Sequence, residues 1–159
     1  MTVLIGMPAS GKTTVCKLYE EIYGEQVYDT DAVIENLHGN IGKIFAEYGE
    51  EYFRQLETEA IRKILDRGDA GLISTGGGTV LREENARLLK EYGKIVYLKA
   101  GLETLLKRLD GDTSRPLLSG NVRERLTELF SERTPIYERV ADIIIDTDGL
   151  TPREILEKI

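Results

Sequence analysis

The segment from Gly6 to Thr13 reads Gly-Met-Pro-Ala-Ser-Gly-Lys-Thr and matches the pattern of a phosphate-binding loop in full. Glycines let backbone N–H groups wrap closely around phosphates, and a helix that begins at the loop directs its positive dipole end at the same anion. We expect Lys12 to reach the β- and γ-phosphates of ATP and the Thr13 hydroxyl to bind Mg²⁺. A chance glycine-rich turn is the alternative, but the segment follows an apolar run and precedes a helical pattern.

Two carboxylates follow a short apolar segment at residues 27–28, in the run Asp29-Thr30-Asp31. A phosphoryl acceptor needs a positioned hydroxyl and a group that takes its proton. Asp31 is a candidate for that group, and Asp29 is a candidate for holding a metal-bound water. The alternative is that one aspartate only caps a helix over residues 32–37.

Three consecutive glycines, Gly76, Gly77 and Gly78, follow another apolar segment at residues 70–74. Without side chains, their N–H groups can closely approach a ligand. An ordinary flexible loop is the alternative, and the triplet alone does not decide between them.

Arginines supply the cations that an anionic substrate would need. Arg54 precedes Glu57 by three residues in a helical pattern, so an ion pair could fix its guanidinium, although a solvated surface pair is the commoner outcome. Arg133 lies just before Pro135, where we expect proline to interrupt a helix. Two guanidiniums that met at one carboxylate would form an anion site.

The segment 110–120 is polar, contains glycine and proline, and separates two helical patterns, which is typical of a mobile lid. Arg115 within it could close onto a transferring phosphate. Arg108, just before the segment, could lie against an adenine ring.

The elements that must position these residues alternate between strands and helices, which predicts an α/β fold with a parallel sheet covered on both faces. In such sheets ligands bind beyond the carboxyl ends of the strands, where the segments above fall. Strands are expected at residues 2–5, 27–28, 70–74, 95–98 and 142–145. Helices are expected at 13–23, 47–67, 82–92, 102–109 and 121–140, with a last one after Pro152.

Composition narrows the classes of function. With 159 residues we expect one domain, and 28 acidic against 21 basic residues give a net charge of −7, which disfavours nonspecific binding to nucleic acid. No apolar run reaches the roughly 20 residues needed to cross a bilayer, and no secretory signal is recognisable. The single Cys16 excludes an internal disulfide, so we expect a cytoplasmic protein and a small buried thiol.

Taken together, these motifs resemble those of the shikimate kinase family. The resemblance runs from the first strand to the last helix. It rests on the phosphate-binding loop, Asp-x-Asp at Asp29, Phe-Arg-x-x-Glu at Phe53, the glycine triplet, Arg-Pro-Leu-Leu at Arg115 and Arg-x-Pro-x-Tyr at Arg133, in this order.

The resemblance implies ATP-dependent phosphorylation of the 3-hydroxyl of shikimate, with ATP and Mg²⁺, by a monomer. It also implies a three-layer α/β/α fold with strand order 2-3-1-4-5, a substrate-binding segment near residues 31–57 and a lid near 110–120. Lys12, Asp31 and Arg115 would be catalytic, and Thr13 with Asp29 would serve the metal. Shikimate would contact Asp31, Phe45, Phe53, Arg54, Glu57, Gly76, Gly77, Gly78 and Arg133. ATP would contact Pro8, Ala9, Ser10, Gly11, Lys12, Thr13, Thr14, Arg108, Arg115 and Pro152.

Two alternatives stay open on the residues alone. Another small kinase of this type, acting on gluconate or a nucleoside monophosphate, would not need the clamp of Arg54 and Arg133. A nucleotide-dependent regulator would bind ATP but should lack a complete acceptor pocket.

Overall fold

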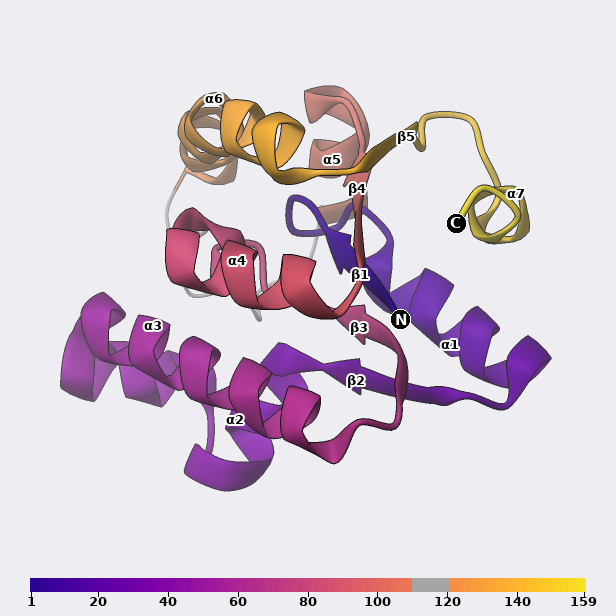
Figure 1. The fold of residues 1–159 in the computed structure, drawn as a ribbon. Helices are drawn as coiled ribbons and strands as arrows, with labels where there is room; N and C mark the ends of the chain where they lie inside the picture. The colour runs from indigo at the N-terminus through magenta and orange to yellow at the C-terminus, as the bar shows by residue number, and fades with distance from the viewer. Residues whose placement is uncertain (110–120) are drawn as a thin grey trace.

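Within residues 1–109 and 121–159, which the computed structural model describes, five strands form one parallel sheet (Figure 1). Their order is β2-β3-β1-β4-β5, and each neighbouring pair is parallel, which confirms the expected topology. The strands are β1 (Thr2–Ile5), β2 (Gln26–Asp29), β3 (Ala70–Ser74), β4 (Lys94–Lys99) and β5 (Ile143–Asp146).

Helices cover both faces of the sheet and give it three layers (Figure 1). One face carries α1 and α7, and the opposite face carries the apolar sides of α3, α4, α5 and α6. The helices are α1 (Lys12–Tyr23), α2 (Thr30–His38), α3 (Ile41–Arg67), α4 (Glu83–Tyr92), α5 (Leu102–Leu109), α6 (Val122–Val140) and α7 (Pro152–Leu156), with a 3₁₀ turn η1 (Thr79–Leu81).

Successive side chains of the central strand β1 belong alternately to the two layers of the core. Val3 and Ile5 of β1 belong to the same buried cluster as Ile61 of α3, whereas Leu4 belongs to the cluster that contains Val15 of α1. All five side chains are fully buried. Because successive side chains of a strand point to opposite faces, an uninterrupted apolar run is what a strand covered on both faces requires.

The long helix α3 begins at Ile41, six residues before the expected start at residue 47. Asn40 caps it by accepting a hydrogen bond from the Lys43 N–H, a start signal that the helical pattern alone did not indicate. Gly49 interrupts the helix with φ 81° and ψ 175°, so α3 consists of two parts joined at a kink. Glycine tolerates this left-handed backbone conformation at low cost.

The expected interruption of α6 by Pro135 is wrong, because the helix runs from Val122 to Val140 with the proline inside it. Proline removes one N–H and crowds the carbonyl of the preceding turn. Pro135 is exposed, while Arg133 and Tyr137 on either side of it are buried. The packing of these flanking side chains therefore offsets the local cost.

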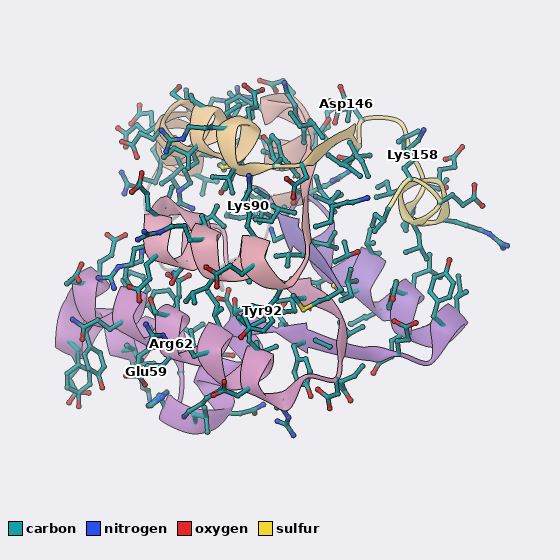
Figure 2. The ribbon with its side chains drawn as sticks, in the orientation of Figure 1. Glu59, Arg62, Lys90, Tyr92, Asp146 and Lys158 are labelled. Carbon is teal, nitrogen blue, oxygen red and sulfur yellow. The ribbon has the colours of Figure 1, made fainter. Side chains whose placement is uncertain are left out.

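Charged side chains cover the outside of the layers. Glu59, Arg62 and Lys158 are exposed and extend from the periphery (Figure 2). In the part of the chain that is described, no helix combines the length and apolar character needed to span a membrane.

Replacement of Ile61 by alanine should lower the free energy of unfolding by about 2–5 kcal/mol, because it leaves a cavity between α3 and the sheet. Urea denaturation followed by circular dichroism measures this change. Ile22→Ala is the matched control, since Ile22 is half exposed at the surface, and we expect it to change stability by no more than about 0.5 kcal/mol. Equal losses in the two variants would contradict the assignment of the core.

Candidate active site

The phosphate-binding loop joins β1 to α1 through backbone conformations that glycine permits. Gly6 and Gly11 have φ values of 148° and 102°, and a Cβ on Gly6 would lie 2.7 Å from the Leu98 carbonyl oxygen. Helix α1 begins at Lys12, and its N-cap residue Gly11 makes no side-chain capping bond. The N-terminal amides of α1 are therefore oriented as an anion site requires.

Lys12 lies across the loop, with 8% of its surface exposed. Its Nζ donates to the carbonyl oxygens of Gly6 and Met7 at 2.9 and 3.0 Å. These bonds fix the ammonium group inside the loop, where a phosphate bound by the amides would lie within its reach.

A cavity of about 740 Å³ opens above the loop and collects segments that are far apart in the sequence. It combines the loop and the start of α1 with the end of β2, the glycine triplet, and residues near α5 and α7. Among the residues that line it are Ala9, Ser10, Gly11, Lys12, Thr13, Thr14, Asp29, Asp31, Gly76, Gly77, Arg108 and Pro152. All of these are site residues expected from the sequence.

Arg108 extends from α5 over the phosphate-binding loop. Its Nη1 donates to the Ala9 carbonyl oxygen at 3.1 Å. Pro152 begins α7 and lines the same cavity. The two residues that are expected at an adenine ring are thus brought to one cavity from two separate helices, α5 and α7.

Asp29, the last residue of β2, and Asp31, in the first turn of α2, have different local roles. Asp29 Oδ1 accepts from the backbone N–H groups of Asp31 and Ala32 at 2.9 and 3.2 Å, so Asp29 caps α2. The capping alternative is therefore confirmed for Asp29, which also lines the cavity. Asp31 approaches the glycine triplet, since a Cβ on Gly76 would lie 2.5 Å from its Oδ1.

The glycine triplet is the place where the two arginines come together. A Cβ on Gly77 would lie 3.1 Å from Arg133 Nη1 and 3.2 Å from Pro8 Cδ. A Cβ on Gly78 would overlap the Arg54 guanidinium. The guanidiniums of α3 and α6 therefore approach consecutive residues of one loop.

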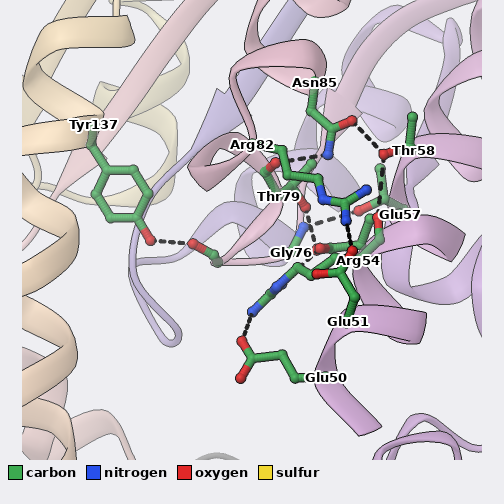
Figure 3. A network of polar contacts seen from close by, with 12 residues as sticks. Glu50, Glu51, Arg54, Glu57, Thr58, Gly76, Thr79, Arg82, Asn85 and Tyr137 are labelled. Carbon is green, nitrogen blue, oxygen red and sulfur yellow. Dashed lines mark hydrogen bonds and ion pairs between the residues drawn. The ribbon is translucent and has the colours of Figure 1, made fainter. Parts of the chain in front are cut away.

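Arg54 is buried, with 7% of its surface exposed, so it does not form the solvated surface ion pair that is the commoner outcome. Its Nη1 lies 2.7 Å from Glu57 Oε2, and its Nη2 lies 2.8 Å from Glu50 Oε1 (Figure 3). Burial alone would lower the pKa of Arg54, but the carboxylates of Glu57 and Glu50 raise it above its ordinary value. The guanidinium is therefore held in its charged form.

Sequence reasoning missed the polar residues that hold Glu57 in place. Glu57 is fully buried, and its Oε1 accepts from Thr79 Oγ1 at 2.7 Å. Asn85 Nδ2 donates to the Thr79 carbonyl oxygen, while Asn85 Oδ1 accepts from Thr58 Oγ1 (Figure 3). These partners lie as many as 27 residues apart in the chain, so no local spacing could indicate them.

In the sequence, Tyr137 stands out only as the last residue of the Arg-x-Pro-x-Tyr motif. In the structure it contacts both the glycine triplet and the phosphate-binding loop. Its hydroxyl donates to the Gly77 carbonyl oxygen, and it lies 3.9 Å from Met7 Sδ. Burial raises the pKa of Tyr137 to about 12 in spite of the opposing effect of Arg133. The phenol is therefore neutral at physiological pH and remains a donor to Gly77.

Arg133 is buried as well, with 3% of its surface exposed. No carboxylate in residues 1–109 or 121–159 forms an ion pair with it, and its buried Nε has no hydrogen-bond partner there. A buried cation without a counter-ion favours an anionic ligand.

Phe45 and Phe53 form an aromatic pair beside Arg54, with ring centroids 4.7 Å apart. The Arg54 Cζ lies 5.5 Å from the Phe53 centroid. The two aromatic residues that are expected to contact shikimate therefore adjoin the guanidinium. Arg115 and the expected lid at 110–120 lie outside the described residues.

Comparison with known proteins identifies the family. The model of the shikimate kinase family matches residues 8–159. The chain belongs to the shikimate kinase family. A shikimate kinase of Thermodesulfovibrio yellowstonii is 46% identical over 99% of this chain and 91% of the relative, and one of Marinomonas sp. is 42% identical over 99% and 88%.

Solved structures of the family have the same fold. Shikimate kinase of Acinetobacter baumannii in complex with shikimate matches with a TM-score of 0.91 and 34% identity, over 99% of this chain and 89% of that one. The enzyme of Aquifex aeolicus matches with a TM-score of 0.82 and 33% identity, over 99% and 93%. Family membership also argues against the two alternatives that the residues alone left open.

The thiol of Cys16, on the apolar side of α1, should be unreactive in the native protein. Its burial, reinforced by the negative charge of Asp29, raises its pKa to about 12, so almost no thiolate exists at pH 8. We expect no measurable reaction with Ellman's reagent at pH 8 over the time in which the urea-unfolded chain reacts completely. Rapid stoichiometric labelling of the native protein would show that the Cys16 thiol is not buried as described.

Proposed function

We propose that the chain catalyses ATP-dependent phosphorylation of the 3-hydroxyl of shikimate to shikimate 3-phosphate, a step towards chorismate and the aromatic amino acids. The observation that carries this proposal is the glycine triplet, where the phosphate-binding loop meets two buried arginines and Asp31. Similarity to named shikimate kinases over almost the whole chain supports the same substrate.

On the nucleotide side, the loop amides and Lys12 bind the phosphates of ATP, and the adenine ring lies between Arg108 and Pro152. Thr13 and Asp29 line the same cavity, and a hydroxyl with one carboxylate suits Mg²⁺, which usually retains several waters. When bound, Mg²⁺ neutralises charge on the phosphates.

On the acceptor side, Arg54 and Arg133 bind the carboxylate of shikimate, because two planar guanidiniums provide several charge-assisted hydrogen bonds. Asp31 accepts hydrogen bonds from the ring hydroxyls and takes the proton of the reacting one. The backbone of Gly77 and Gly78 supplies further contacts. Phosphoryl transfer requires mainly such positioning and neutralisation of charge.

Three further assignments rest on the resemblance and the composition. Arg115 neutralises the transferring phosphate together with Lys12, and residues 110–120 act as the lid. The enzyme works as a cytoplasmic monomer on a small-molecule substrate. Its net charge of −7 argues against nucleic acid as a partner.

A coupled assay of ADP release tests the function directly. Shikimate should stimulate ADP release strongly, whereas gluconate and nucleoside monophosphates should not. Lys12→Met should lower kcat by at least about 10²-fold, because it removes a cation that stabilises the transferring phosphate. Stimulation by another acceptor alone, or near-normal turnover without Lys12, would overturn the proposal.

Arg133→Ala should raise the KM for shikimate by about 10- to 150-fold, the range that corresponds to a hydrogen bond with a charged group. The KM for ATP should change little, because in this proposal Arg133 binds the carboxylate of shikimate and not the nucleotide. Arg139→Ala is the matched control, since Arg139 is exposed on the same helix. A collapse of ATP affinity with unchanged shikimate affinity would show that the assignment is wrong.

A further inference from the structure

The two carboxylates that contact Arg54 differ in how firmly they are held. Glu57 is fully buried, and each of its oxygens has a partner, Arg54 Nη1 for one and Thr79 Oγ1 for the other. Glu50 contacts Nη2, and 55% of its side chain is exposed to solvent. Glu57 is therefore a permanent partner of Arg54, whereas Glu50 can exchange with water.

The surroundings of Arg54 restrict the direction from which another anion can approach. Gly78 is so close to the guanidinium that it leaves no space for a Cβ, and the Phe53 ring lies beside Arg54 Cζ. Glu57 occupies Nη1. Nη2 is in contact with Glu50, which is exposed, so an incoming carboxylate can reach Nη2 by displacing Glu50 (Figure 3).

The backbone next to Glu50 makes its release inexpensive. Gly49 breaks α3 immediately before Glu50, so Glu50 stands at the start of the second helical part. A carboxylate at the N-terminus of a helical segment is stabilised by the unpaired N–H groups of its first turn. The Glu50 side chain can therefore turn into solvent and still keep a favourable electrostatic position.

From this geometry we propose that Glu50 is a positioning residue that occupies the substrate-carboxylate position of Arg54 until shikimate displaces it. Glu50 keeps the guanidinium oriented and neutralised in the empty site, and it competes with the substrate for Nη2. This inference rests on the proposed function. Its consequence is unusual for a residue near a binding site, because neutralising Glu50 should strengthen substrate binding.

The test compares Glu50→Gln with Glu51→Gln in the full chain by isothermal titration with shikimate. Each variant removes one negative charge, but Glu51 pairs with Arg82 and not with Arg54 (Figure 3). The Kd of Glu50→Gln should fall by about two- to fivefold, the effect of releasing a partly exposed ion pair, and that of Glu51→Gln should stay unchanged. The gain should shrink at high salt, and the KM for ATP should not change.

Several results would overturn the inference. A purely structural role for Glu50 predicts weaker binding in Glu50→Gln, and a general charge effect predicts equal tightening in both variants. An unchanged Kd would exclude competition at Nη2. If the wild-type chain neither binds nor phosphorylates shikimate, the proposed function fails first; if it does both, only the role of Glu50 is in question.

Discussion

Three consecutive residues without side chains allow the separate parts of the site to touch. A Cβ on Gly76 would meet Asp31 and Glu57, one on Gly77 would meet Arg133, and one on Gly78 would overlap Arg54. The loop that follows β3 thus brings α2, α3 and α6 within contact distance of the same short backbone. Steric exclusion at these positions, more than any single ion pair, sets where the charged groups can be.

Buried polar contacts then hold the loop in place. The Gly76 N–H donates to Thr30 Oγ1, and the Gly77 carbonyl oxygen accepts from Tyr137. Both partners are fully buried, so breaking either bond would leave a polar group without water. The triplet, which as a sequence suggested an ordinary flexible loop as readily as a site, is held by hydrogen bonds from two elements, α2 and α6.

How much of this site the sequence predicts depends on how far apart in the chain the interacting residues lie. The phosphate-binding loop could be predicted because its eight consecutive residues contain the whole pattern, and α1 follows directly. The environment of Arg54 could not be predicted, because spacing indicates Glu57 but not Thr79 or Asn85, which come from other elements. Likewise, Pro135 locally disfavours a helix, but the tertiary packing of Arg133 and Tyr137 keeps α6 continuous through it.

Charge balance connects the empty and the occupied site. Around the triplet, the described residues place two guanidiniums, Arg54 and Arg133, near three carboxylates, Asp31, Glu57 and Glu50. Glu57 is fully buried beside Arg54, so if Glu50 left without a replacement, Arg54 Nη2 would lose its ion pair. A substrate carboxylate replaces that ion pair, whereas a neutral polyol does not. A chain with a net charge of −7 can thus select an anionic substrate, since the local balance around the glycines decides which ligand is accepted.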